Sequence, residues 1–379
     1  MDPTSIGIVG CGFVADFYAD TLPLHPELHL AAVTDRDPAR AQAFARYHGV
    51  RCCGSLRQLL DDPEIDIVLN LTNPASHFEV SRAALLAGKH VYSEKPLAMD
   101  VQEAGVLVEL ALAQGRQLSA APCSLLGETA QTVWQALRQQ RIGRVRLVYA
   151  EMEDGLVHRM PYRRWRSASG APWPYKDEFA VGSTIEHAGY YLSWLPAFFG
   201  PARQVTAFSA CLVPDKLADA AAGDPGPDFS VACLRFASGV VARLTCSTVA
   251  PRDRSLRIIG DEGILQVPDC WDYRAPVYLR RRLTIRRRTV MCPWKWRCRL
   301  PRAAAGSIRI RHGHPMDFCR GVADLALAVR EHRPPRLSAR YCLHVTELAL
   351  RISQALDKGA SCRLSSSFEP ALPMAWAQK

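Results

Sequence analysis

The chain has 379 residues, of which 48% are hydrophobic and 22% charged, and it carries a formal net charge of +10. This length predicts two domains, and the composition excludes a largely disordered chain, a collagen-like repeat and a disulfide-stapled miniprotein. Twelve Lys or Arg residues and no acid lie between Ala275 and Met316, so the rest of the chain nets about −2 and the positive charge belongs to one segment.

The first 120 residues alternate short apolar runs with amphipathic stretches. The pattern predicts strands over residues 5–9, 28–34, 65–71 and 90–93 and near residue 118, with helices after residue 12 and over residues 38–48, 78–87 and 101–114. Strands that alternate with helices through short links form a parallel sheet with right-handed crossovers. We therefore expect a doubly wound Rossmann domain over residues 1–122.

The regular alternation of predicted strands and helices ends after residue 122. Helices are predicted over residues 125–139, 183–199, 315–331 and 339–357, a strand over residues 145–153, and several extended segments over residues 203–290. Pro196 should kink or end the helix that contains it. We expect residues 123–379 to form a second α/β domain on a largely antiparallel sheet.

A glycine-rich turn follows the first predicted strand and opens the first helix. Its residues are Gly10, Cys11, Gly12, Phe13, Val14 and Ala15, which fit the G-x-G-x-x-G/A pattern. The glycines permit a tight turn and a close approach of a pyrophosphate, whose charge is favoured at a helix N-terminus. The turn therefore predicts a dinucleotide site.

An acidic residue, Asp35, ends the second predicted strand about 25 residues after the turn. A carboxylate at this place accepts hydrogen bonds from the ribose hydroxyls of the adenosine and repels a 2′-phosphate, so NAD is favoured. Arg36 leaves NADP open, because it could stack on adenine or meet a phosphate; its alternative is a solvated surface charge.

Further motifs along the chain are Glu94-Lys95-Pro96, Thr72-Asn73-Pro74 with His77, Asp35-Arg36-Asp37-Pro38, Met316-Asp317-Phe318 and Leu343-His344-Val345. With the glycine-rich turn, they give the chain a strong resemblance to the Gfo/Idh/MocA family, the glucose–fructose oxidoreductase and inositol dehydrogenase group. The resemblance covers essentially the whole chain. It implies a Rossmann domain followed by an α/β domain on a large open sheet, with the nicotinamide between them and facing a sugar, cyclitol or related polyol. We also expect a homo-oligomer, a dimer or tetramer formed through the C-terminal sheet.

By this resemblance, Lys95 touches both the substrate hydroxyl and the nicotinamide ribose. An ammonium there stabilises the developing alkoxide. Glu94, Thr72, Asn73 and Pro74 are assigned to the cofactor site. For His77, a structural role at a helix N-terminus competes with a cofactor contact.

Members of the family usually carry Asp-x-x-x-His on a helix of the second domain, about ten residues before a glycine. The same spacing from Gly200 gives Glu186 and Tyr190 in this chain. Positions i and i+4 share a helix face, so both could address one pocket. Tyr190 as proton relay would need its pKa lowered by Lys95. His187 is the competitor, because its ordinary pKa near 6.5 suits a base, and a local irregularity of the helix would bring it to the site.

The loop before this helix is rich in Pro, Trp and Arg. Aromatic faces and guanidinium groups suit sugar rings and anionic substituents, so substrate contacts are assigned to Arg163, Trp165, Trp173 and Lys176. The alternative is a merely structural loop.

The basic segment over residues 280–299 is expected to be an exposed, partly disordered excursion. A contact with a phosphate of the substrate is the alternative. No nucleic-acid motif accompanies the segment, and we expect neither a nucleic-acid nor a membrane partner. Cys292 and Cys298, with His312 and His314 nearby, lack the tight paired spacing of a zinc site, so no metal is expected.

The thirteen cysteines are scattered and odd in number, and the N-terminus has no secretory pattern, so we expect reduced thiols in the cytoplasm. The function predicted is an NAD(P)-dependent oxidoreductase that transfers a hydride between nicotinamide and a carbinol of a sugar, cyclitol or sugar nucleotide, assisted by Lys95. Two alternatives stay open. One is an NAD-dependent glycoside-cleaving enzyme that oxidises, eliminates and reduces back, and the other is a non-catalytic regulator that senses dinucleotide.

Overall fold

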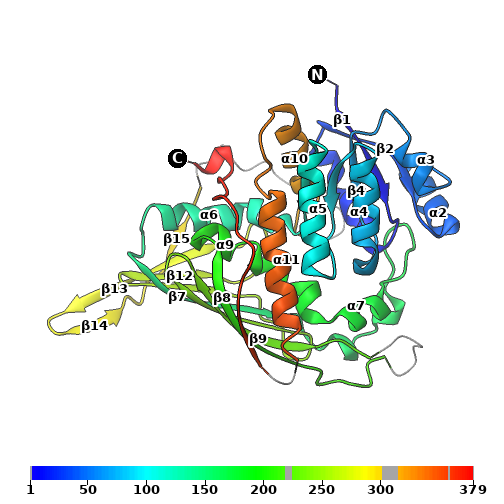
Figure 1. Ribbon diagram of the computed structural model, residues 1–379. Helices are drawn as coiled ribbons and strands as arrows, with labels where there is room; N and C mark the ends of the chain where they lie inside the picture. The colour runs from blue at the N-terminus through cyan, green and yellow to red at the C-terminus, as the bar shows by residue number, and fades with distance from the viewer. Residues whose placement is uncertain (1, 218–223, 301–314, 357–358, 379) are drawn as a thin grey trace.

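The computed structural model describes residues 2–217, 224–300, 315–356 and 359–378. Its described residues form a six-stranded sheet and a ten-stranded sheet, with helices packed between and around them (Figure 1). The predicted fold class is confirmed: a parallel Rossmann sheet precedes a larger, mostly antiparallel sheet.

All strand pairs of the first sheet are parallel, in the order β3-β2-β1-β4-β5-β6. The strands are β1 (Thr4–Val9), β2 (Leu28–Thr34), β3 (Arg51–Cys52), β4 (Ile67–Asn70), β5 (His90–Ser93) and β6 (Leu118–Ala120). The strand order changes direction between β1 and β4, since β2 and β3 are added on one side of β1 and β5 and β6 on the other side of β4. A ligand crevice forms at such a switch point. The short strand β3 was not predicted, because its two exposed residues carry no apolar pattern.

Helices cover both faces of this sheet. They are α1 (Phe13–Thr21), α2 (Pro38–His48), α3 (Leu56–Leu60), α4 (His77–Leu86) and α5 (Val101–Ala113), with the 3-10 turns η1 (Leu22–Leu24) and η2 (Pro74–Ser76). A late helix, α10 (Arg320–Arg330), also packs into this domain. A Cβ at Gly321 of α10 would collide with the Tyr92 hydroxyl, so glycine permits this close packing. Helix α10 therefore packs on the Rossmann domain although it comes after the second sheet in the chain.

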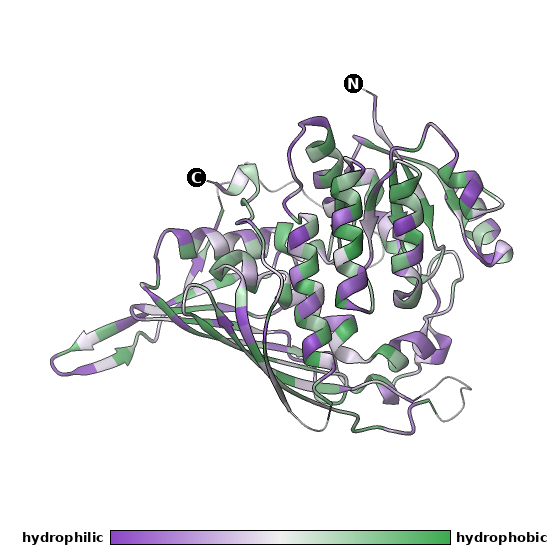
Figure 2. Cartoon of the chain, viewed as in Figure 1, coloured by the Kyte–Doolittle hydropathy of each residue, from purple (hydrophilic) through white to green (hydrophobic). Residues whose placement is uncertain are grey.

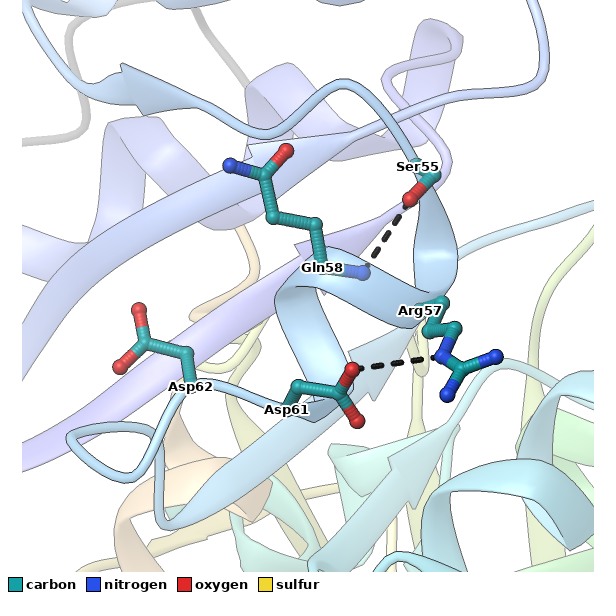
Figure 3. A pocket seen from close by; sticks show the side chains of 5 residues that line it. All are labelled: Ser55, Arg57, Gln58, Asp61 and Asp62. Carbon is teal, nitrogen blue, oxygen red and sulfur yellow. Dashed lines mark hydrogen bonds and ion pairs between the residues drawn. The ribbon is translucent and has the colours of Figure 1, made fainter.

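The surface of the short helix α3 holds a shallow depression (Figure 3). The Ser55 hydroxyl accepts a hydrogen bond from the Gln58 N–H at 3.1 Å, which caps the helix. Arg57 lies 3.4 Å from Asp61, an i,i+4 ion pair. Helix capping and surface charge account for these side chains.

The second sheet has the order β14-β13-β12-β11-β7-β10-β9-β8-β16, and β15 also pairs with β13. Its strands are β7 (Val145–Glu153), β8 (Ala202–Ala210), β9 (Phe229–Phe236), β10 (Val241–Ser247), β11 (Leu256–Gly260), β12 (Gly263–Val267), β13 (Val277–Ile285), β14 (Arg288–Met291), β15 (Trp296–Cys298) and β16 (Ala360–Arg363). The pair β7–β10 is parallel and the other described pairs are antiparallel.

Helices α6 (Glu128–Arg138), α9 (Leu195–Phe199) and α11 (Ala339–Ser353) lie on one side of this sheet (Figure 1). Helix α11 lies between the sheet and α5, so it joins the two domains. The remaining described elements are α7 (Tyr175–Val181), α8 (Gly189–Leu192), η3 (Cys123–Leu126), η4 (Val157–Arg159), η5 (Tyr162–Arg164), η6 (Thr184–Ala188) and η8 (Ala375–Ala377).

The helix predicted over residues 183–199 is interrupted. It begins with a π-helical turn, η6, continues as α8, and restarts as α9 with Pro196 in its first turn. Proline is well accommodated at the start of a helix, where its missing N–H has no partner to lose. The π turn matters for the functional site, because it changes the direction of the side chains around Glu186.

The basic segment forms an ordered arm, which corrects the expectation of partial disorder. Strands β13 and β14 pair through Arg282, Leu283, Thr284 and Ile285 and project beyond the body of the molecule (Figure 1). Cross-strand hydrogen bonding holds the ribbon together despite its charge. Hydrophilic and hydrophobic residues alternate along it (Figure 2), and Ile285 is 59% exposed.

Candidate functional site

One cleft of about 1460 Å³ runs from the carboxyl ends of the Rossmann strands to the second domain. All the predicted catalytic residues line it, and so do the predicted cofactor residues except Cys11: Gly10, Gly12, Phe13, Val14, Asp35, Arg36, Thr72, Asn73, Pro74, His77, Glu94 and Lys95. The Cys11 side chain is buried, and its thiol points to the Thr34 carbonyl oxygen at 3.6 Å.

The glycine-rich turn has the shape that a pyrophosphate requires. Gly10 has φ +98°, and a Cβ there would lie 2.7 Å from the Leu71 backbone. A Cβ at Gly12 would meet no atom within 4 Å, so the space above the first residue of α1 is open. Free N–H groups at this helix end favour an anion. The residues present therefore fit a dinucleotide.

The Asp35 carboxylate lies at the end of β2 with only 5% of its side chain exposed. One oxygen accepts the Cys11 N–H at 2.8 Å, and the other accepts the Asp37 N–H at 2.8 Å. Arg40 lies 3.8 Å from Asp35, and Arg36 is exposed at the edge of the cleft. The carboxylate is thus held in place beside the glycine-rich turn, with two arginines near it.

His77 joins the two loops of the Rossmann domain that contain Thr72 and Pro96. Its Nδ1 lies 2.6 Å from the Pro96 carbonyl oxygen and its Nε2 lies 2.9 Å from the Thr72 carbonyl oxygen. Burial lowers the pKa of His77, which is fully enclosed. These contacts support the structural role for His77, with its ring also forming part of the cleft wall.

Lys95 follows β5 and reaches across the cleft to the second domain. Its ammonium forms an ion pair with the Glu186 carboxylate. Burial disfavours the ammonium, but the Glu186, Glu178 and Glu94 carboxylates more than offset this, so the pKa of Lys95 lies above its ordinary value. Lys95 is therefore cationic at neutral pH, as stabilisation of an alkoxide requires.

Glu94 and Glu178 complete the acidic surroundings of Lys95. The Glu94 carboxylate accepts hydrogen bonds from the Tyr18 hydroxyl at 2.8 Å and the Lys95 N–H at 3.1 Å. Burial and the neighbouring Glu186 carboxylate hold the pKa of Glu178 well above its usual range. Lys95 thus balances carboxylates from both domains.

The π turn brings Glu186, His187 and Tyr190 to the same cleft wall, which the α-helical spacing did not predict. A π-helix has more residues per turn than an α-helix, so neighbouring side chains diverge less around its axis. His187 Nδ1 lies 3.2 Å from Asp154 Oδ2, without the alignment of a hydrogen bond. Geometry therefore keeps both Tyr190 and His187 as candidates.

The pKa values of Tyr190 and His187 both differ from those expected from the sequence. Burial and the nearby Glu94 carboxylate hold the pKa of Tyr190 well above 10, whereas a relay lowered by Lys95 was expected. Burial and the Lys95 cation lower the pKa of His187 to about 3. Both side chains are thus neutral at physiological pH, Tyr190 as a proton donor and His187 as an imidazole.

Two matches with known protein families follow the two-domain architecture. Residues 4–121 match the family described as "Oxidoreductase family, NAD-binding Rossmann fold", and residues 130–266 match the "GFO/IDH/MocA C-terminal domain". The chain belongs to the Gfo/Idh/MocA family. It is therefore an NAD(P)-binding oxidoreductase.

Relatives of this Gfo/Idh/MocA protein include enzymes with named substrates. The trans-1,2-dihydrobenzene-1,2-diol dehydrogenase of Danio rerio is 28% identical over 268 residues, covering 69% of this chain and 73% of that enzyme. The fold is shared with a dehydrogenase from Bordetella pertussis solved with NADH and UDP-GlcNAcA (TM-score 0.71, 22% identity, 96% and 98% coverage of this chain and that chain). It is also shared with a lysine-to-alanine mutant of a 3-ketoreductase from Actinomadura kijaniata, solved with TDP-benzene and NADP (TM-score 0.70, 21% identity, 94% and 98% coverage).

The predicted substrate loop of this Gfo/Idh/MocA protein reaches the cleft through Trp165, Trp173 and Lys176. Arg163 is absent from the cleft lining. Its guanidinium lies 5.8 Å from the ring centres of Tyr162 and Tyr175, in the cluster of aromatic side chains behind the loop. The attraction between the cation and the aromatic faces accounts for this position.

Asp154, Arg254 and Trp271 are among the cleft residues of the second domain that sequence reasoning missed. The Arg254 guanidinium lies 3.3 Å from the centre of the Trp271 ring and forms an ion pair with Asp154. The Trp271 ring centre lies 5.0 Å from that of Tyr190. Asp154 directly follows a predicted strand, which was a usable signal, but Arg254 and Trp271 meet the site only through the tertiary fold.

The structure offers no metal centre among the residues it describes, since no group of three or more His, Cys, Asp or Glu side chains is suitably placed. Of the four residues considered for a zinc site, Cys292 and Cys298 are described by the structure, whereas His312 and His314 lie outside the described residues. The search for membrane spans over the described part of the chain finds no helix that is long and apolar enough to cross a bilayer.

Proposed function

We propose that the protein is an NAD(P)-dependent dehydrogenase or reductase acting on a CH–OH group of a sugar, cyclitol or sugar nucleotide. The observation that carries this proposal is the cation of Lys95, paired with Glu186 and facing Tyr190 and His187 where the dinucleotide cleft meets the second domain. Relatives that act on a cyclic diol or were solved with sugar nucleotides support the substrate class.

When bound, the nicotinamide supplies or accepts the hydride. Lys95 lies where its charge would stabilise a substrate alkoxide, and Glu186 keeps the ammonium in that position. Tyr190, held neutral by its raised pKa, would donate a proton to the carbonyl oxygen during reduction and recover it during oxidation. Because His187 is a neutral imidazole beside Asp154, we assign it a secondary role in shaping this wall.

The walls of the cleft suit a substrate with both hydroxyl groups and an apolar face. Trp165, Trp173 and Trp271 supply aromatic surfaces that can pack against the C–H face of a sugar ring. Glu178 and Lys176 supply hydrogen-bonding groups on the same side of the cleft. We include Trp165, Trp173 and Lys176 among the proposed substrate contacts and leave out Arg163.

The experiment that tests the proposed function is a substrate panel. The purified protein is mixed with NAD or NADP and with sugars, cyclitols, cyclic diols or sugar nucleotides, and the reduced nicotinamide is followed by its absorbance. We expect reduction of the cofactor by at least one polyol. Cleavage of glycosides with tightly held NAD and no net reduction would favour the glycoside-cleaving alternative, whereas dinucleotide binding without any turnover would favour the regulator.

For the cofactor, we propose that Asp35 binds the adenosine ribose and favours NAD over NADP. Asp35→Ala should weaken NAD binding by about tenfold or more, because a hydrogen bond to a charged group contributes about 1.5–3 kcal/mol. Fluorescence titration measures the dissociation constant of NAD for the wild type and for Asp35→Ala. Asp61→Ala is the matched control, since it removes an equal charge that pairs with Arg57 on α3. Unchanged NAD affinity in Asp35→Ala would contradict the assignment.

We also propose that the enzyme works in the cytoplasm as a dimer or tetramer formed through its C-terminal sheet. All thirteen cysteines are free thiols, which suits a reducing compartment.

A further inference from the structure

A loop of the second domain, residues 160–174, extends to the Rossmann domain and forms one wall of the dinucleotide cleft. We call it the strap. In Figure 1 it is the green segment that rises before α7 toward the blue helices. Trp165, Pro172 and Trp173 of the strap line the same cleft as Gly12 and Phe13 of the glycine-rich turn.

The tip of the strap is hydrogen-bonded to the first helix of the Rossmann domain. The Ser169 N–H and hydroxyl donate to one oxygen of Asp16, at 3.1 Å and 2.8 Å. The other Asp16 oxygen lies 2.6 Å from His48 Nε2 of α2. Asp16 is 1% exposed, so this contact between the two domains is buried.

Asp16 connects the strap to the helix that follows the glycine-rich turn. Asp16 lies in the first turn of α1, the helix whose N-terminus faces the pyrophosphate position. A buried carboxylate is costly unless charged or polar donors satisfy it. Burial would raise the pKa of Asp16, but the hydrogen bonds from His48, Ser167 and Ser169 outweigh it and the pKa is lowered. The strap therefore supplies some of the hydrogen-bond donors that stabilise the buried Asp16 carboxylate.

The tip itself is a closed turn that presents Ser169. The Ser167 N–H donates to the Ala171 carbonyl oxygen at 2.9 Å, and the Ser167 hydroxyl accepts the Ala171 N–H at 3.1 Å. Arg166 and Pro172 form a β-bridge at its base. Because the tip is internally bonded, losing the contact to Asp16 would release the strap without dissolving the turn.

We infer that Asp16 and Ser169 form a latch that holds the strap over the bound dinucleotide and slows its dissociation. Asp16 is thus a positioning residue that acts through the strap. The inference rests on the proposed function in one respect, namely that the dinucleotide occupies the cleft at Gly10–Val14. It goes beyond that function by naming what controls exchange of the cofactor.

The first measurement is the dissociation rate of NADH, followed by its fluorescence after mixing with excess NAD. Asp16→Ala should raise the rate by about tenfold or more, because it removes charge-assisted hydrogen bonds. Ser169→Ala should raise it a few-fold, since the backbone N–H remains. Asp16→Asn keeps one oxygen acceptor but not the charge, so its rate should lie between those of wild type and Asp16→Ala. Because Trp165 and Trp173 of the strap are proposed substrate contacts, the dissociation rate is measured without substrate, and the substrate KM should rise in Asp16→Ala.

The second measurement is tryptic cleavage of the strap in the intact protein. Arg163, Arg164 and Arg166 are exposed trypsin sites within it. Asp16→Ala should speed cleavage there several-fold, and NADH should protect the wild-type strap. Asp100→Ala is the matched control, because Asp100 accepts the Gln102 and Glu103 N–H groups at the start of α5, away from the strap.

Equal NADH dissociation rates and equal strap cleavage in wild type, Asp16→Ala and Ser169→Ala would overturn the latch. Faster dissociation with equal effects in Asp100→Ala would also overturn it, because general loosening of the domain would then be the cause. A wild-type protein that binds no dinucleotide would refute the proposed function instead. In that case faster strap cleavage in Asp16→Ala would still show the mechanical latch, and equal cleavage would reject it.

Discussion

Replacing Lys95 by alanine should lower kcat by about 10²- to 10⁴-fold, the range expected when a group that assists proton transfer and stabilises charge is lost. The buried ammonium is paired with Glu186, and its pKa is raised by the surrounding carboxylates. It therefore meets the reacting oxygen as a cation. Steady-state kinetics with the best substrate of the panel, at saturating cofactor, measures the loss.

The controls for Lys95→Ala must separate chemistry from cofactor binding and from folding. Without Lys95, the Glu186 carboxylate would lose its cationic partner, so thermal unfolding of each variant is measured in parallel. Lys95→Met keeps the length of the side chain without its charge and should lose kcat to a similar extent. Normal kcat with weaker NAD binding would recast Lys95 as a cofactor ligand alone.

Tyr190→Phe should lower kcat by about 10²-fold or more, whereas His187→Asn should cost much less. The phenylalanine keeps the ring that packs against Trp271 but removes the hydroxyl that we assign to proton transfer. Because the pKa of Tyr190 is raised well above 10, the donor form persists through neutral pH and is lost only in strong alkali. Since the pKa of His187 is about 3, His187 should contribute no ionisation to the pH profile between about 5 and 9.

The adjacent Tyr191 provides a matched control for this prediction. Its hydroxyl donates to the Arg254 carbonyl oxygen at 2.5 Å, and its ring is fully buried in the core. Tyr191→Phe should therefore leave kcat within a few-fold and lower the free energy of unfolding by about 1 kcal/mol. A larger loss in His187→Asn than in Tyr190→Phe would transfer the proton-transfer role to His187.

The Rossmann half was predictable because its signals are local. Buried parallel strands appear as continuous apolar runs, and the glycine-rich turn and Asp35 stand at fixed places relative to those strands. The observed strands β2 and β5 match the predicted ranges of residues 28–34 and 90–93. Helix α10 packs on the core of the Rossmann domain although it comes late in the chain, and a sequence shows that a helix is amphipathic without showing which core covers its apolar face.

The candidate site depended more on tertiary structure. The spacing of Glu186 and Tyr190 placed them together, but a π turn is invisible to spacing rules, and it is what adds His187 to the wall. Arg254 and Trp271 lie in separate segments between strands and meet only in the folded chain, and the raised pKa of Tyr190 follows from burial that the sequence does not show. The residues of the glycine-rich turn and Lys95 were available in advance because local motifs carry them.

The arm ends the large sheet at β14, and in the described part of the chain no further strand pairs with its outer edge. An open edge of this kind can add strands from other molecules without limit. Here the turn and edge carry Arg286, Arg287 and Arg288, so two arms brought side by side would set these like charges against each other. Repulsion between these arginines therefore opposes edge-to-edge pairing of two arms.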